Sequence, residues 1–110
     1  MNRIDEARDE FTALRRLDSR SPAGPTGLGT VAMIAGHWRE AEEQFIEALL
    51  LDPPSITARQ SLALLNERTE RPAEALRWCR EIEALAPETP DNADCLRRNA
   101  SRLVAPPPAR

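Results

Sequence analysis

The chain has 110 residues, of which 41% are hydrophobic and 30% are charged, a balance typical of folded domains and too apolar for disorder. A net charge of −3 argues against a nucleic-acid-binding protein, and 4% aromatic residues leave little surface for stacking on bases. No apolar run approaches the roughly 18 residues of a membrane span. The first six residues lack the apolar core of a secretory signal. We therefore expect a cytoplasmic protein that binds neither nucleic acid nor membranes.

Apolar residues at helical spacing, punctuated by proline and glycine, predict an all-α fold with no strand. In chain order, the expected helices span residues 3–18, 25–36, 38–51, 55–69, 72–86 and 90–103. Pro53 and Pro87 should stop the third and fifth helices. Ser55 is suited to cap the fourth helix, and Pro72 is suited to the first position of the fifth. Residues 104–110 are expected to form an extended, proline-rich tail.

The first expected helix carries a full apolar stripe. Its members are Ile4, Ala7, Phe11, Leu14 and Leu17. Only the helix over 25–36 is available to cover this stripe, so part of it should stay exposed and invite pairing. We expect Ile4 or Phe11 to contact something outside the fold of this chain, either upstream sequence or a second copy in a homodimer.

The third and fifth helices carry equivalent apolar stripes, in which small residues let a partner helix approach closely. The third has Trp38, Ala41, Phe45, Ala48 and Leu49, and the fifth has Ala75, Cys79, Ile82 and Leu85.

These stripes belong to an internal repeat with an offset of 34 residues. Glu6-Ala7 recurs as Glu40-Ala41 and as Glu74-Ala75. Leu28 recurs as Leu62 and as Leu96. A fixed period of this length indicates a structural unit that stacks on its neighbours.

The repeat resembles the tetratricopeptide repeat, a helix–turn–helix unit of 34 residues. The copy over 22–55 has Leu28-Gly29, Gly36, Trp38, Ala41, Phe45, Ala48 and Asp52-Pro53 at the family's spacing. The copy over 56–89 has Leu62-Ala63, Ala75, Ile82 and Pro87, but Glu70 replaces the turn glycine and Cys79 replaces the aromatic. The resemblance implies a right-handed solenoid of antiparallel helix pairs over residues 1–103. The helix over 3–18 would then stand alone at one end, and the helix over 90–103 would cap the other.

The resemblance also implies that the first helix of each unit lines a concave groove that binds a protein or peptide partner. The groove candidates are Thr26, Thr30, Met33, Gln60, Leu64, Glu67, Asp94 and Arg98. With Arg98 and Arg68 towards one end, a peptide with an acidic end would fit. Some family members grip a chaperone's C-terminal carboxylate, but Thr26, Thr30 and Ser61 stand where that clamp uses Lys and Asn.

The expected function is therefore a protein-interaction module of scaffold, adaptor or co-chaperone type. Two alternatives remain: a self-assembling structural module, and an accessory fragment of a larger protein of the repeat family. In the self-assembling module, the exposed ends of the repeat array would bind other copies of the chain.

The sequence offers no candidate catalytic, metal or cofactor site. Acidic residues are plentiful, but they fall on solvated helix faces rather than converging in a cleft. His37 is expected to be a turn residue, and one histidine with two distant cysteines does not form the ligand cluster of a zinc site. Cys79 is expected to be a buried, inert thiol. A disulfide with Cys95 would require their Cα atoms to approach to about 6 Å.

Overall fold

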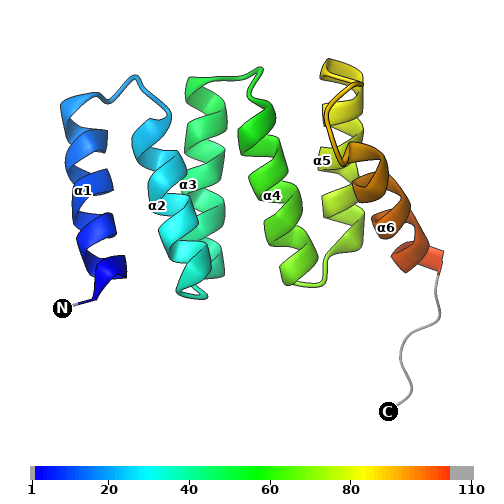
Figure 1. Ribbon diagram of the computed structural model, residues 1–110, viewed down its shortest axis with the longest axis horizontal. Helices are drawn as coiled ribbons and strands as arrows, with labels where there is room; N and C mark the ends of the chain where they lie inside the picture. Colours follow the sequence, from blue (N-terminus) through cyan, green and yellow to red (C-terminus); the bar gives the residue numbers. More distant parts are fainter. Residues whose placement is uncertain (1, 105–110) are drawn as a thin grey trace, which may run out of the picture.

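The structure is a computed structural model that describes residues 2–104, and in this range it consists of six α-helices with no strand. The helices are α1 (Arg3–Leu17), α2 (Ala23–Ile34), α3 (Trp38–Leu51), α4 (Ile56–Arg68), α5 (Pro72–Leu85) and α6 (Asn92–Val104). They stand side by side, with α1 at one end and α6 at the other (Figure 1). The predicted all-α class is confirmed, and every predicted helix boundary lies within two residues of the observed one.

Each helix packs against the helix that follows it in sequence, and α2 also reaches α4. The turns between them have local causes. Gly36 takes a φ of +78°, which glycine adopts without strain, and thereby ends α2. At the other connection, the Ser55 hydroxyl accepts a hydrogen bond from the Ala58 N–H at 3.0 Å, so the predicted cap of α4 is confirmed.

The largest differences from the predicted boundaries lie in two helices: α2 spans Ala23–Ile34 rather than 25–36, and α6 spans Asn92–Val104 rather than 90–103. Helix α2 begins at Ala23, before Pro25, because a proline fits in the first turn of a helix, where its missing N–H has no intrahelical partner. The Ser21 hydroxyl accepts a hydrogen bond from the Ala23 N–H at 3.1 Å. Val104, which we expected in an extended tail, is the last residue of α6. The first proline beyond it is Pro106, so the sequence does not forbid helix through Val104. The rest of the predicted tail, residues 105–110, lies outside the described residues.

The centre of the core lies between α2, α3 and α4. Phe45 is 1% exposed and packs with Ala32, Ala41 and Leu62, which are also buried. A Cβ placed on Gly29 would lie 2.5 Å from the Phe45 ring, so the ring occupies the space that this glycine leaves open. The small residues of the repeat therefore set the spacing between helices.

The predicted inward stripes are largely confirmed. The buried members are Ala41, Phe45 and Ala48 in α3, and Ala75, Cys79 and Ile82 in α5. Leu85 is an exception at 50% exposed, because it is the last residue of α5 and the chain turns away there. Trp38 also lies at the end of a helix, as the first residue of α3, and its side chain is 39% exposed.

Helix α1 packs closely on α2 at two glycines, and a Cβ on the first, Gly24, would lie 2.7 Å from the Arg15 Cα. A Cβ on Gly27 would lie 2.2 Å from the Phe11 ring, which therefore lies directly on the α2 backbone. Arg15 reaches past α2 and donates two hydrogen bonds to Glu47 of α3, at 2.7 and 2.8 Å. No residue of α1 is fully buried, and Leu17, expected in the apolar stripe, is 85% exposed at the end of the helix.

Candidate functional site

Three hollows that share residues run along α2, α4 and α6, and together they form what we call the groove. The first, of about 570 Å³, is lined by Phe11, Ser21, Pro22, Ala23, Thr26, Gly27, Thr30, Asp52, Ser55 and Thr57. The second, of about 230 Å³, is lined by Thr30, Met33, Ile34, Phe45, Ser61, Leu64 and Arg68. The third, of about 370 Å³, is lined by Gln60, Ala63, Leu64, Glu67, Ile82, Pro90, Asp91, Asn92, Cys95 and Arg98. Thr30 joins the first hollow to the second, and Leu64 joins the second to the third.

The structure brings the predicted partner-binding residues together along this groove. Those in its hollows are Thr26, Thr30, Met33, Gln60, Leu64, Glu67 and Arg98. Asp94 lies just beyond, in an adjoining hollow that shares Arg98. Met33 is only 8% exposed and therefore contributes to the floor of the groove rather than to its rim. That these residues bind a partner stays a prediction.

The two residues expected to contact a partner at the N-terminal end have different surroundings. Phe11 is partly buried against Gly27 and also lines the first hollow, so its ring is engaged within the chain. Ile4 is partly exposed on α1 and lines none of the three groove hollows. A contact of this end with a second copy stays a prediction.

The middle hollow of the groove combines apolar and hydroxyl groups with one cation. Met33, Ile34 and Leu64 supply apolar surface, and Ser61 supplies a hydroxyl. Arg68 lies at this hollow and forms no ion pair with any residue in the described range 2–104. The hollow therefore offers an apolar pocket beside an exposed positive charge.

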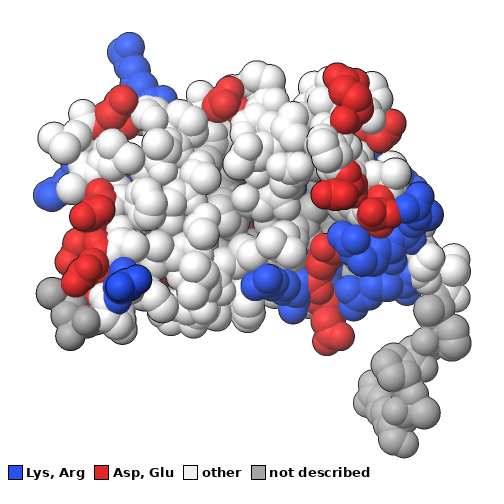
Figure 2. Space-filling model, viewed as in Figure 1, with Lys and Arg blue, Asp and Glu red and all other residues white. Residues whose placement is uncertain are grey.

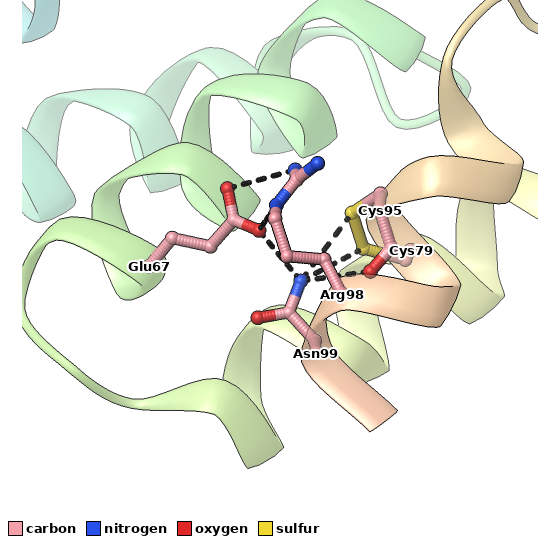
Figure 3. A network of polar contacts seen from close by, with 5 residues as sticks. All are labelled: Glu67, Cys79, Cys95, Arg98 and Asn99. Carbon is pink, nitrogen blue, oxygen red and sulfur yellow. Dashed lines mark hydrogen bonds and ion pairs between the residues drawn. A yellow bond between two sulfur atoms is a disulfide. The ribbon is translucent and has the colours of Figure 1, made fainter. Parts of the chain in front are cut away.

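The third hollow contains a polar network between α4 and α6 (Figure 3). Arg98 donates two hydrogen bonds to the Glu67 carboxylate, at 2.8 and 3.1 Å, and the Asn99 amide donates a third at 2.7 Å. The hydrogen bonds that Arg98 donates to the Glu67 carboxylate raise the pKa of the Arg98 guanidinium above its usual range. Since Glu67 already neutralises Arg98, this arginine does not support the expected preference for an acidic peptide end.

A disulfide between Cys79 of α5 and Cys95 of α6 lies directly beside this network (Figure 3). The two Cα atoms are 6.1 Å apart, close to the roughly 6 Å that a disulfide between these residues requires. Cys79 is fully buried, as expected, but the expectation of an inert thiol is wrong, because the side chain is bonded to Cys95. The sequence could not show this pairing, since it depends on how α6 turns back onto α5.

Two buried asparagines of α6 were also missed. The Asn92 amide donates to the Cys79 carbonyl at 3.1 Å, and Asn99 is completely buried beside the disulfide. The 34-residue offset could have revealed both residues. It aligns them with Ala58 and Leu65, two buried apolar residues of α4. Helix α6 thus carries amides where α4 carries core side chains.

Charge is unevenly distributed over the visible face. Figure 2 shows arginine side chains gathered at the α6 end, with a largely uncharged surface over α2 and α4. The arginines that α6 contributes are Arg97, Arg98 and Arg102. Arg97 pairs with Asp94, and Arg102 lies 3.9 Å from Glu70, so carboxylates balance much of this charge.

A separate hollow of about 340 Å³ lies between the start of α3 and the end of α4. Trp38 and Asn66 line it together with Arg39 and Arg71. It shares no residue with the groove.

A comparison with models of protein families gives no match, and a comparison with curated proteins gives no significant match. Among residues 2–104, no group of three or more His, Cys, Asp or Glu side chains is placed to hold a metal ion. Within the same part of the chain, no helix has the length and apolarity needed to cross a membrane.

Proposed function

We propose that the chain is a tetratricopeptide-type array of helix pairs that binds a peptide segment of another protein in the groove, without catalysing a reaction. The observation that carries the proposal is the continuity of the three hollows. They join side chains from α2, α4 and α6, which the repeat places at equivalent positions. A surface assembled from successive units is how solenoid proteins form extended binding sites.

The chemistry of the groove defines the partner. The middle hollow accepts one apolar side chain between Met33 and Leu64. Arg68 beside it favours a carboxylate on the same peptide, from Asp, Glu or a chain terminus. We therefore propose an extended segment with an apolar anchor followed closely by an acidic group.

Selection from a displayed library of random peptides tests this proposal. Peptides selected on the whole chain should carry the apolar–acidic pattern, and Leu64→Arg should weaken their binding about tenfold or more, because it fills the middle hollow with a charged side chain. Affinity is measured by fluorescence anisotropy of a labelled selected peptide.

Leu50→Arg provides the matched control, since Leu50 is 75% exposed on α3 and lines none of the groove hollows. It should leave binding within about twofold of the wild type. Equal binding to both variants, or a failure to select any peptide, would count against the groove as the binding site.

Self-assembly through the N-terminal end is the second candidate function. Helix α1 has no fully buried residue, and Ile4 and Leu14 are only partly covered. Exposed apolar surface at the end of an array favours association. Sedimentation velocity over a range of concentrations measures the assembly state: a concentration-independent monomer excludes this function, whereas a dimer lost in Ile4→Glu supports it.

We retain the cytoplasm as the proposed location, and the disulfide makes this proposal testable. Permanent disulfides are typical of oxidising compartments, whereas those of cytosolic proteins are usually transient. Rapid alkylation of thiols in intact cells should therefore capture a fraction of Cys79 and Cys95 in the reduced form. A fully oxidised pair would place the protein in an oxidising compartment.

A further inference from the structure

We propose that the disulfide between Cys79 and Cys95 is a reversible latch that holds α6 against α5 and thereby keeps the third hollow of the groove closed on one side. This inference rests on the proposed function for its consequence, because the hollow belongs to the proposed binding groove.

The way in which α6 is attached supports this inference. Its only buried residues are Asn92 and Asn99, so no apolar residue of α6 is fully buried. Hydrogen bonds of buried amides contribute little net stability, since the same groups bind water when α6 is free. The Asn99 side-chain oxygen is buried and has no hydrogen-bond partner among residues 2–104, which costs stability further. Besides the hydrogen bonds to Glu67, the disulfide is therefore a principal restraint on α6, and it is the one that a reductant can remove.

The two cysteine residues differ in exposure. Cys79 is fully buried, whereas Cys95 is partly exposed and lines the third hollow. A reducing thiolate can thus reach Cys95 Sγ from the groove without prior unfolding of the chain.

Opening requires a dithiol reductant. One of its thiolates attacks Cys95 Sγ, forms a mixed disulfide and releases Cys79 as a thiolate, which takes up a proton. The second thiol of the reductant then displaces the Cys95 sulfur, which leaves as a thiolate and is protonated, and the reductant departs as a disulfide. Two electrons and two protons have then passed to the protein, and a disulfide oxidant reverses the exchange.

Release of α6 would change the groove directly. The segment that includes Pro90, Asp91 and Cys95 forms one wall of the third hollow, and α4 forms the facing wall. Arg98 and Asn99 hold the Glu67 carboxylate across this hollow (Figure 3). When α6 moves away, the hollow loses that wall and Glu67 loses both partners, so the groove gains an unpaired negative charge.

Hydrogen exchange read by mass spectrometry tests the latch on the whole chain without any ligand. We compare the oxidised protein with the same protein treated with dithiothreitol. Reduction should speed exchange of the α6 amides about tenfold or more, while the amides of α3 and α4 change by less than about twofold. Cys95→Ser, which cannot form the bond, should exchange fast in α6 under both conditions.

A non-reducing digest should first show the Cys79 and Cys95 peptides joined in the air-oxidised protein. Absence of that joined peptide, or α6 exchange that reduction leaves unchanged, would overturn the latch. So would a loss of protection in all helices together, because the bond would then stabilise the whole fold. If Cys95→Ser fails to fold, by far-ultraviolet circular dichroism, reduction of the wild type still decides the question. None of these readouts uses a peptide, so failure of the latch and failure of the proposed function are distinguishable.

Discussion

The two ends of the helix row are attached by different chemistry. At one end, α1 lies on α2 through the Phe11 ring, which fits the space left by Gly27. At the other end, α6 is joined to α5 by a disulfide and buries only two asparagines. Both terminal helices also reach past their neighbour with an arginine–carboxylate pair, Arg15 to Glu47 and Arg98 to Glu67.

The difference teaches how a terminal helix is kept in place when only one of its faces is covered. A ring packed on a glycine-bearing helix stabilises through shape and apolar area, which do not respond to redox conditions. A disulfide with polar burial does respond. The same row of helices therefore has one permanent end and one end that its surroundings can control.

A substitution at the centre of the helix row provides a reference for the stability of the two ends, and it has the largest expected effect. Phe45→Ala removes a ring that is 1% exposed between three helices, so it should lower the free energy of unfolding by about 3–5 kcal/mol. Urea denaturation followed by circular dichroism measures the change. A loss below about 1 kcal/mol would mean that the centre of the row is no more stable than its ends.

Reduction of the disulfide should destabilise the α6 end by less than Phe45→Ala destabilises the centre. The disulfide closes a loop between cysteines 16 residues apart, for which chain entropy predicts a loss of roughly 3 kcal/mol when the bond is broken. Hydrogen exchange of the α6 amides with and without a reductant measures it, and the amides of α3 and α4 should keep their protection. The double variant Cys79→Ser with Cys95→Ser is the control and should not respond to reductant at all.

The α1 end should instead be sensitive to volume. Gly27→Ala introduces a Cβ that would lie 2.2 Å from the Phe11 ring, so α1 must shift, at a cost of about 1–3 kcal/mol. Gly36→Ala is not a matched control, because Gly36 has a positive φ. Ala23→Ser is suitable, since Ala23 is exposed in the same helix, and it should change stability by less than about 0.5 kcal/mol. If the two variants have equal stability, the ring does not pack on Gly27.

The smallest expected effect comes from the ion pair of α1. The hydrogen bond from Arg15 lowers the pKa of Glu47, so the unfolded chain binds the proton more tightly than the folded one. The pair therefore stabilises the fold above the ordinary glutamate pKa, and this contribution is lost as the pH falls through the lowered value. Since both side chains are partly exposed, Glu47→Gln should cost only roughly 0.5 kcal/mol at neutral pH. The difference from wild type should vanish in acid, as thermal unfolding at several pH values would show.

Much of the fold could be predicted because the repeat encodes it locally. Ala41 and Phe45 are four residues apart, a spacing that places both on one face of a helix, and both positions recur at the offset of 34 residues. Proline and glycine then mark where each helix ends. The residues wrongly predicted to be buried lie at helix ends, as Leu17 and Leu85 do. There the apolar periodicity continues in the sequence, but no neighbouring helix covers the side chain.

The candidate site was predicted less completely, for a physical reason. The groove residues from Thr26 to Arg98 follow from the repeat, because equivalent positions on successive helices face the same side. The links made by Glu67 and Cys95 depend instead on how α6 is rotated against α4 and α5. That rotation is set by side-chain packing between elements far apart in the sequence, and no local pattern reports it.

The sequential contacts of the helices also bear on how the chain acquires its structure. Each helix contacts the one synthesised just before it, and the reach from α2 to α4 spans only one intervening helix. Contacts this local are closed at small entropic cost and favour rapid folding. The segment from α1 to α4 can thus complete its core before α6 has left the ribosome. Of the six described helices α6 is synthesised last, and its attachment is completed by an oxidation that proceeds on a much slower timescale than helix packing.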